Sequence, residues 1–162
     1  MKATDVMKSP VITVNESASL SEVARLLEEK NISGAPVVDD AGRLVGIVSE
    51  MDLIRRSQEL QVKSYRDPFA WVSPYTSIEE MATFTQGLCR VGETPISKIM
   101  TKRVYSVNED ESLEEVAKIM ARRRINRLPV LRGQEVVGII SRGDLVWAMG
   151  NLCERKPGIL DQ

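Results

Sequence analysis

The chain has 162 residues, of which 43% are hydrophobic, 22 are basic, 23 are acidic, two are cysteine and none is histidine. Its length fits one medium domain or two small ones, and the lack of histidine excludes Ser-His-Asp catalysis, Cys-His catalysis and HExxH zinc sites. The net charge of −1 argues against a nucleic-acid binder, because such proteins usually carry a basic surface.

The N-terminus and the cysteines indicate the compartment of the protein. Residues Met1–Asp5 lack the apolar stretch of a signal peptide, and no aliphatic run approaches the roughly 20 residues that span a bilayer. Cys89 and Cys153 are too few for a disulfide framework, and we interpret them as buried or incidental thiols rather than nucleophiles. We therefore predict a soluble, cytoplasmic protein with no membrane contact.

The two ends of the chain repeat each other. Residues Val14–Glu16 recur as Val107–Glu109, 93 positions later, and many further matches follow at the same offset. From Val45 onward the offset is 92, so one residue is lost shortly before it. The loss falls in the turn-like segment Asp39–Gly42, and a hairpin turn tolerates a deletion without disturbing its strands. We therefore interpret the sequence as an internal duplication.

Each copy predicts the same elements in chain order. In the first copy, a short strand at 11–14 precedes a helix that begins at the capping box Ser19-x-x-Glu22. Two nearly continuous apolar strands follow at 36–38 and 44–48, as expected for strands covered on both faces, and a second helix begins after Ser49. Apolar residues recur at helical spacing in the first helix, at Leu20, Val23, Ala24 and Leu27.

The second copy predicts the same order. Its short strand lies at 104–107, and its first helix begins at the capping box Ser112-x-x-Glu115. Its apolar strands lie at 129–131 and 136–140, and its second helix begins after Ser141. The predicted fold is therefore α/β (α+β), with the order β-α-β-β-α occurring twice.

These residues resemble the cystathionine-beta-synthase (CBS) domain. The likeness rests on an opening Val-Met or Ile-Met, the capped helix, an Ile-x-x-x-Pro-Val pattern and a later Gly-Ile-(Val/Ile)-Ser-x-x-Asp-Leu pattern, each present twice in register. The resemblance implies a small stand-alone protein in which CBS motifs at 1–56 and 95–150 pack as a pseudo-two-fold pair, or Bateman module. Residues 57–94 then form an insertion, and residues 151–162 form a C-terminal tail.

Two Ser-x-x-Asp turns carry the chemistry of the predicted binding sites. Ser49–Asp52 and Ser141–Asp144 lie where a strand ends and a helix begins, so backbone N–H groups and the positive helix end favour an anion there. By resemblance, the two acids bind ribose hydroxyls and the two serines are their polar partners. The same spacing also describes a capping box, which stabilises a helix without any ligand. The sequence leaves both interpretations open.

The second copy has the better residues for a phosphate. The family often places a His-Arg pair before the Leu-Pro of this strand, and here the pair is Asn126-Arg127, so one expected phosphate ligand is weakened. A guanidinium fork suits phosphate oxygens, which makes Arg127 the strongest candidate and Arg142 a weaker one. Glu50 replaces Arg142 in the first copy and would repel phosphate. We therefore expect tighter nucleotide binding at the site that uses Asp144.

Further ligand contacts follow from the resemblance. Small residues before Pro36 would let an adenine ring approach the backbone. The run Arg122–Arg124 has a simpler explanation, because cations in the last turn of a helix complement its dipole and are mostly solvated. The predicted ligand contacts are Thr13, Gly34, Ala35, Pro36, Ser49, Asp52, Ser106, Asn126, Arg127, Leu128, Pro129, Ser141, Arg142 and Asp144.

The insertion at 57–94 has no copy elsewhere in the chain. It carries five of the seven aromatic residues, namely Tyr65, Phe69, Trp71, Tyr75 and Phe84. The capping box Ser77-x-x-Glu80 predicts a helix that runs toward Leu88, so we expect a folded segment rather than a linker. Such a segment either covers the core of the module or forms a dimer contact or a lid over a nucleotide site.

The predicted function is a regulatory, non-catalytic module. The sequence has neither a Walker A nor a GxGxxG motif, and no spacing pairs two carboxylates or a nucleophile with a base. The resemblance implies AMP, ADP or ATP bound in clefts between the two motifs, with no other cofactor and no metal. It also implies a homodimer that regulates another protein, and the sequence does not identify that protein. The alternatives are a structural dimerisation module without a nucleotide, or a binder of S-adenosylmethionine, NAD or nucleic acid.

Overall fold

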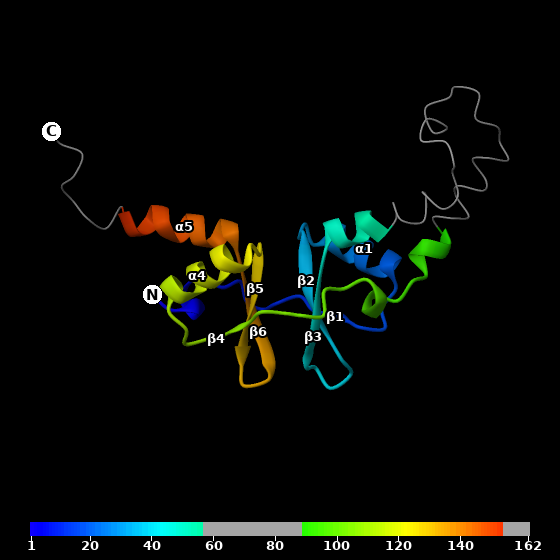
Figure 1. The fold of residues 1–162 in the computed structure, drawn as a ribbon, viewed down its shortest axis with the longest axis horizontal. Helices are drawn as coiled ribbons and strands as arrows, with labels where there is room; N and C mark the ends of the chain where they lie inside the picture. The colour runs from blue at the N-terminus through cyan, green and yellow to red at the C-terminus, as the bar shows by residue number, and fades with distance from the viewer. Residues whose placement is uncertain (57–88, 154–162) are drawn as a thin grey trace, which may run out of the picture. The chain divides into compact units, whose positions relative to one another are not determined.

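The computed structural model describes residues 1–56 and 89–153, which form two compact units (Figure 1). Unit 1 holds Met1–Ile12, Gly42–Leu44 and the described part of Tyr105–Gln162, whereas unit 2 holds Thr13–Ala41 and the described part of Val45–Val104. Each unit combines a three-stranded sheet with helices, so the fold is mixed α+β. The predicted fold class is confirmed.

Unit 2 is built on a sheet with the strand order β1-β2-β3. Strand β1 spans Val14–Asn15, β2 spans Gly34–Val38 and β3 spans Leu44–Ser49, and β1 runs parallel to β2. Helix α1 spans Leu20–Glu29, a second helix spans residues 50–56, and a 3₁₀ helix spans Ile96–Lys98. Its core consists of Val14, Val23, Leu27, Ala35, Val37, Val48, Leu53, Ile96 and Met100.

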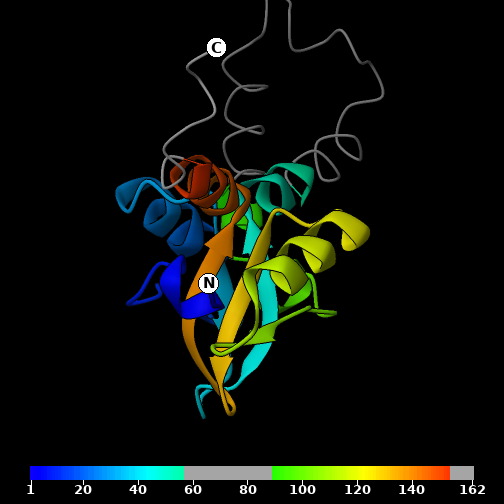
Figure 2. The same cartoon turned by 90° about the vertical axis from the view of Figure 1, so that its left-hand side faces the viewer.

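Unit 1 repeats this plan with the strand order β4-β5-β6. Strand β4 spans Val107–Asn108, β5 spans Arg127–Arg132 and β6 spans Glu135–Ser141; β4 is parallel to β5, and β6 is antiparallel to it. Helix α4 spans Leu113–Arg123, α5 spans Arg142–Cys153, and a 3₁₀ helix spans Ala3–Asp5. The N-terminal segment lies beside β6, to which Lys8 forms a bridge at Ile139 (Figure 2).

Both predicted helix starts are present, but their caps differ. The Ser19 backbone N–H donates to Glu22 Oε2 at 2.8 Å, and the Glu22 N–H donates back to Ser19 Oγ at 3.3 Å, which completes the predicted capping box. At the second start, Ser112 Oγ accepts from the Glu115 N–H at 3.2 Å. The Ser112 N–H, however, donates to the carboxylate of Glu111 at 3.0 Å. The second box is therefore incomplete, because the preceding residue supplies the acid.

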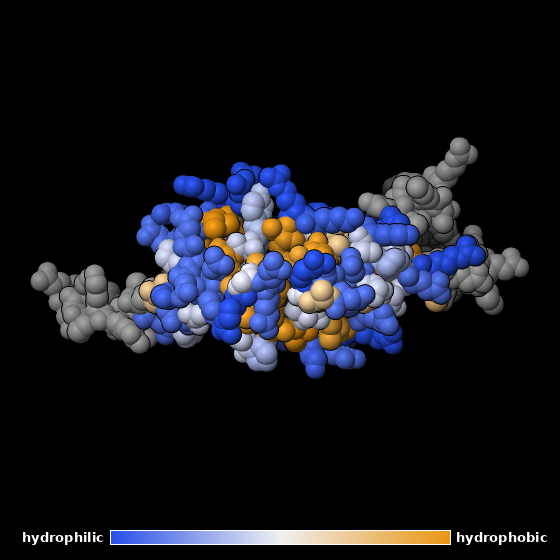
Figure 3. Space-filling view, turned by 90° about the horizontal axis from the view of Figure 1, so that it is seen from below, coloured by the Kyte–Doolittle hydropathy of each residue, from blue (hydrophilic) through white to orange (hydrophobic). Residues whose placement is uncertain are grey.

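The long strands and their turns follow the sequence closely. The predicted hairpin turns contain Gly42 and Gly133, whose φ values of +76° and +62° favour glycine. Strands β2 and β5 begin two residues earlier than predicted. In β3, Gly46 and Val48 are buried whereas Val45 and Ile47 are half-buried, so one face of this strand is covered fully and the other only in part. Figure 3, a view from below, shows hydrophobic residues among hydrophilic ones at the surface.

The opening segments differ most from the prediction. The strands expected at 11–14 and 104–107 are shorter and begin later, because pairing with the neighbouring strand starts only at Val14 and Val107. The residues before them join the core of the opposite repeat. The Ala3 N–H donates to the Glu111 carbonyl at 2.8 Å in unit 1, and the Ile96 N–H donates to the Ala18 carbonyl at 2.7 Å in unit 2. The two repeats thus exchange their opening segments.

Some sequence predictions fall outside the described residues. These are the aromatic residues of the insertion, the capping box at Ser77 and residues 154–162 of the tail. Within residues 1–56 and 89–153, no helix is both long and apolar enough to cross a membrane. Across the same ranges, no group of three or more cysteine, aspartate or glutamate side chains has an arrangement suited to a metal ion. Cys89 is a free, exposed thiol.

Candidate functional site

The predicted ligand residues of each repeat gather at one edge of its sheet. In unit 1, β4 and β5 are parallel and β6 is antiparallel, so the start of β4, the start of β5 and the end of β6 lie at the same edge. Ser106 precedes β4, Arg127 begins β5 and Ser141 ends β6, where Arg127 and Ser141 are paired across the strands. Strand pairing therefore assembles side chains that lie 35 positions apart in the sequence.

The Ser141–Asp144 turn is closed by hydrogen bonds of its own. The Ser141 backbone N–H donates to Asp144 Oδ2 at 2.7 Å, and its hydroxyl donates to the same oxygen at 2.5 Å. The Asp144 N–H donates back to Ser141 Oγ at 3.3 Å. This reciprocal cap starts α5 and holds the Asp144 side chain 14% exposed at the sheet edge. All the bonds to the carboxylate end on Oδ2, so capping uses one of its two oxygens.

The first repeat forms the same turn in unit 2. The Ser49 N–H and hydroxyl both donate to Asp52 Oδ2, each at 2.8 Å. The capping interpretation of the two Ser-x-x-Asp turns is therefore confirmed. It does not compete with a ligand role, because the same bonds fix each carboxylate at the edge where β1, β2 and β3 present Thr13, Gly34 and Ser49.

Four predicted contacts have their side chains in the core instead of at the surface. Ala35 and Leu128 are fully buried, and Pro36 and Pro129 are too. Pro36 lies beside Thr13 and Pro129 lies beside Ser106, as the strand registers Val14↔Val37 and Val107↔Val130 require. These values cover whole residues, so neither the side chains nor the backbone of these four residues is exposed at the edge.

Lys8 joins the site of unit 1, and the sequence did not indicate it. Its ammonium lies 3.8 Å from Asp144 Oδ1, and its side chain is 73% exposed. Its N–H and carbonyl both pair with Ile139 of β6, at 2.9 and 3.2 Å. The corresponding position in unit 2 is Thr101, which pairs with Ile47 in the same way but carries no charge. The signal was hidden because Lys8 belongs to the opening segment of the other repeat.

The remaining charged positions make the two edges unequal. The Arg142 N–H donates to the Asn126 carbonyl at 3.1 Å, and the Glu50 N–H donates to the Ser33 carbonyl at 3.2 Å. The backbones are therefore equivalent, while an exposed arginine in unit 1 replaces an exposed glutamate in unit 2. The sequence predicted Arg123 to be a mostly solvated cation in the last turn of α4. In the structure its guanidinium also lies over the Tyr105 ring, 4.7 Å from the ring centroid.

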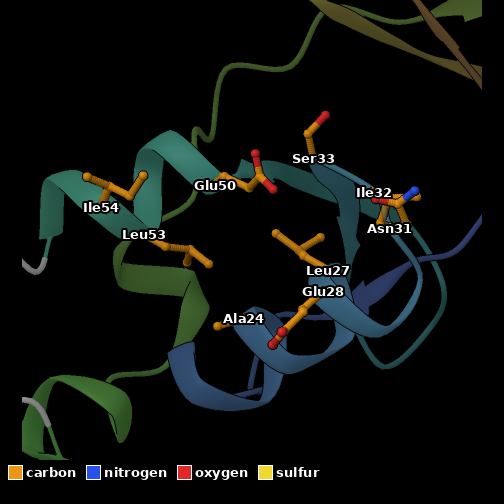
Figure 4. Close-up of a pocket in the computed structure, with 9 residues that line it drawn as sticks. All are labelled: Ala24, Leu27, Glu28, Asn31, Ile32, Ser33, Glu50, Leu53 and Ile54. Carbon is orange, nitrogen blue, oxygen red and sulfur yellow. The ribbon is translucent and has the colours of Figure 1, made fainter.

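Unit 2 also has an open hollow that the sequence did not indicate (Figure 4). It has a volume of about 800 Å³ and lies between α1 and the helix at 50–56. Leu27 and Leu53 line its middle, and Glu28 and Glu50 stand on either side of them. The other residues that line it are Ala24, Asn31, Ile32, Ser33 and Ile54. None of them is among the ligand contacts predicted from the sequence.

Comparisons with known proteins match most of the chain. The family model of the CBS domain matches residues 3–59 and 96–151. An uncharacterized protein of Methanocaldococcus jannaschii is 32% identical over 151 residues, which cover 90% of this chain and 89% of that protein. The CBS domain of a membrane protein from Sphaerobacter thermophilus has a similar structure, with a TM-score of 0.72 and 31% identity over 91% of this chain and 86% of that one.

Two similar structures contain adenosine compounds. CBSX2 of Arabidopsis thaliana was solved with AMP and has a TM-score of 0.69 at 26% identity, covering 94% of this chain and 98% of that one. The CBS domain pair of protein MJ0100 was solved with 5′-methylthioadenosine and S-adenosyl-L-methionine, and has a TM-score of 0.67 at 26% identity and the same coverage. An L-aspartate semialdehyde sulfurtransferase of Methanocaldococcus jannaschii is 27% identical over 142 residues, but these are only 22% of that enzyme.

Proposed function

The chain belongs to the CBS domain family, and on that premise we propose that it is a non-catalytic regulatory module that binds an adenine nucleotide. The ligand is AMP, ADP or ATP, and its binding sites are the sheet edges that carry Ser141–Asp144 and Ser49–Asp52. The protein acts as a homodimer, and nucleotide binding signals to a separate regulated protein. A ligand regulates in this way only if it binds one conformation more tightly than another.

The duplicated Ser-x-x-Asp turn is the observation that carries this proposal. It places one carboxylate, with one oxygen left over from capping, at the same edge of each sheet. Vicinal ribose hydroxyls are donors that suit such a carboxylate. The structures of CBSX2 with AMP and of MJ0100 with two adenosine compounds support the choice of an adenosine ligand.

The two edges differ in the charge that would meet a phosphate. In unit 1, the Lys8 ammonium lies 3.8 Å from Asp144 Oδ1, Arg127 is paired across the strands with Ser141, and Arg142 directly follows Ser141. In unit 2, the corresponding positions are Thr101, Gly34 and Glu50. A phosphate is attracted by the first set and repelled by the glutamate of the second. We therefore place the tighter nucleotide site in unit 1.

Thermal unfolding with and without nucleotide tests the proposal. At a nucleotide concentration of 100 times Kd, binding stabilises the folded state by about 2.7 kcal/mol, which raises Tm by roughly 5–10 °C for a chain of this size. We expect this increase with at least one of AMP, ADP and ATP. Asp144→Ala should abolish most of it. Asp52→Ala is the matched control, because it removes the same cap from the other unit and should leave most of the increase intact.

A structural dimerisation module is the second candidate, because the bonds between Ser and Asp form a helix cap whether or not a ligand is bound. Titration calorimetry with AMP, ADP and ATP that finds no site, together with an intact dimer in light scattering, would establish that role. A titration with S-adenosylmethionine distinguishes this structural role from a role in binding S-adenosylmethionine. Native mass spectrometry of the freshly purified protein reports the oligomeric state and any bound adenosine compound in one measurement.

A further inference from the structure

Each opening segment carries a methionine that the proposed nucleotide site does not use. Met7 and Met100 are the methionines of the Val-Met and Ile-Met pairs that the duplication repeats. Met7 lies against Gly138 of β6, and Met100 lies against Gly46 of β3, so closely that a Cβ on either glycine would overlap the thioether sulfur. The two contacts are equivalent, and each holds an opening segment on the last strand of a sheet.

The two methionines differ in how far solvent reaches them. Met7 is half-buried, although it packs against the core of unit 1, whereas Met100 is 9% exposed and belongs to the core of unit 2. A thioether within reach of solvent is open to oxidation by hydrogen peroxide, which produces the polar sulfoxide. We therefore expect peroxide to oxidise Met7 well before Met100.

The contact of Met7 is directly linked to the candidate site of unit 1. Lys8 follows Met7, and its N–H and carbonyl pair with Ile139, the residue after Gly138, at 2.9 and 3.2 Å. The Lys8 ammonium lies 3.8 Å from Asp144 Oδ1. The same two segments of chain therefore make the methionine contact and the backbone pairing that places the ammonium. Loss of the first contact loosens the second and moves the charge away from the site.

We propose that the contact between Met7 and Gly138 is a redox-sensitive switch, and that oxidation of Met7 weakens nucleotide binding in unit 1 by displacing Lys8. The Met7 sulfur gives an electron pair to one oxygen of hydrogen peroxide, an S–O bond forms, the O–O bond breaks, and water leaves. The sulfoxide oxygen is polar and disfavours the apolar contact that the thioether makes. Methionine sulfoxide reductases reverse the step. This inference rests on the proposed nucleotide site and adds its regulation.

Peroxide treatment of the full chain tests the switch, with Cys89→Ser and Cys153→Ser to exclude thiol oxidation. Peptide mass spectrometry follows the oxidation of each methionine, and calorimetry measures AMP affinity before and after treatment. We expect the affinity to fall several-fold as Met7 is oxidised, and to recover with methionine sulfoxide reductases A and B. Met7→Leu should prevent this loss, because leucine has no sulfur, whereas the matched control Met100→Leu should not. Equal losses in the two variants, or oxidation of Met100 before Met7, would overturn the proposal.

Lys8→Ala shows whether Met7 acts through Lys8. In this variant oxidation should cause little further loss of AMP affinity, because the two changes remove the same contact and are not additive. A loss as large as in the original chain would mean that oxidation acts by general destabilisation, which contradicts the proposal. Hydrogen exchange gives a readout without nucleotide, since oxidation should speed exchange of the Lys8 amide. AMP binding that survives complete oxidation of Met7 refutes the switch alone, whereas no AMP binding before treatment refutes the nucleotide site itself.

Discussion

Met7 packs its side chain against the backbone of Gly138, so closely that a Cβ on this glycine would collide with the thioether sulfur. Met100 packs in the same way on Gly46 of unit 2. Each opening segment therefore docks on the last strand of its sheet through a methionine that requires a glycine beneath it. This contact fixes the segment that also brings Lys8 to the candidate site.

Replacing Gly138 by alanine should loosen this docking. In Gly138→Ala the added methyl group overlaps Met7, whose Sδ, Cγ and Cβ must all shift, at a cost of about 1–3 kcal/mol in the free energy of unfolding. Gly150→Ala is the matched control, because it lies in α5 with open space around it and gains helix propensity. Urea unfolding measures both. A Gly138→Ala protein as stable as the control would show that the opening segment is not held in this position.

Ile96 should be essential to the core of unit 2. It is fully buried although it lies in the opening segment of the second repeat. We expect Ile96→Ala to lower the free energy of unfolding by about 2–5 kcal/mol and Ile96→Val by about 0.5–1.5 kcal/mol. Ile99, which is half-buried in the same segment, is the control, and its alanine variant should cost clearly less. Equal losses at the two positions would argue against the exchange of opening segments.

Acid should weaken the protein in part through Glu109. The Arg132 guanidinium donates two hydrogen bonds of 2.7 Å to its carboxylate and thereby holds the pKa of Glu109 below its ordinary value of 4.5. The unfolded chain then takes up the proton at a higher pH than the folded one. The stability contributed by this group is present above pH 4.5 and is lost as the pH falls through the lower folded pKa.

Glu109→Gln should therefore lose less stability than the original protein between neutral pH and pH 3, although it is less stable at neutral pH. Urea midpoints at a series of pH values measure this difference. Glu29→Gln, at the exposed end of α1, is the control and should follow the original profile. Parallel acid profiles for Glu109→Gln and the original chain would contradict the assignment.

Lys8 should contribute more to phosphate binding than to binding of the nucleoside. Its ammonium stands 3.8 Å from the carboxylate of Asp144, at the edge where we place the nucleotide. We expect Lys8→Ala to weaken AMP binding several-fold, because a charged hydrogen bond contributes about 1.5–3 kcal/mol and this side chain is largely exposed. Adenosine binding should change less than AMP binding does. Thr101→Ala, at the corresponding place of unit 2, is the control; equal effects of the two variants on AMP affinity, measured by calorimetry, would exclude this role.

The sequence predicted the parts of the fold that local chemistry determines. Ser19 and Ser112 predicted the two helix starts, and Gly42 and Gly133 predicted the two hairpin turns. The repeat in register indicated the family and both Ser-x-x-Asp turns. Those signals lie within a few residues of the feature that they specify, and so they can be read without knowing which strands pair.

What the sequence did not predict depends on long-range pairing. The backbone of Lys8 hydrogen-bonds to that of Ile139, and the backbone of Thr101 to that of Ile47. The pattern of apolar residues in the sequence does not indicate which core each opening segment joins. The hollow beside Leu27 arises where two helices separated by β2 and β3 face each other. The cap at Ser112 was misassigned for a smaller reason, since Glu111 competes with Glu115 for the same N–H. The ligand roles of the edge residues remain predictions that the variants above test.

The exchange of opening segments also determines when the protein can fold during its synthesis. The first repeat leaves the ribosome without residues 93–104, which unit 2 needs to complete its core, and residues 1–12 must wait for the second repeat. At about 5–20 residues per second, unit 2 is incomplete for several seconds after residue 56 is made. Unit 2 therefore completes its core only once residue 104 has emerged, and unit 1 only once the second repeat has emerged, so neither repeat, expressed alone, carries a complete core.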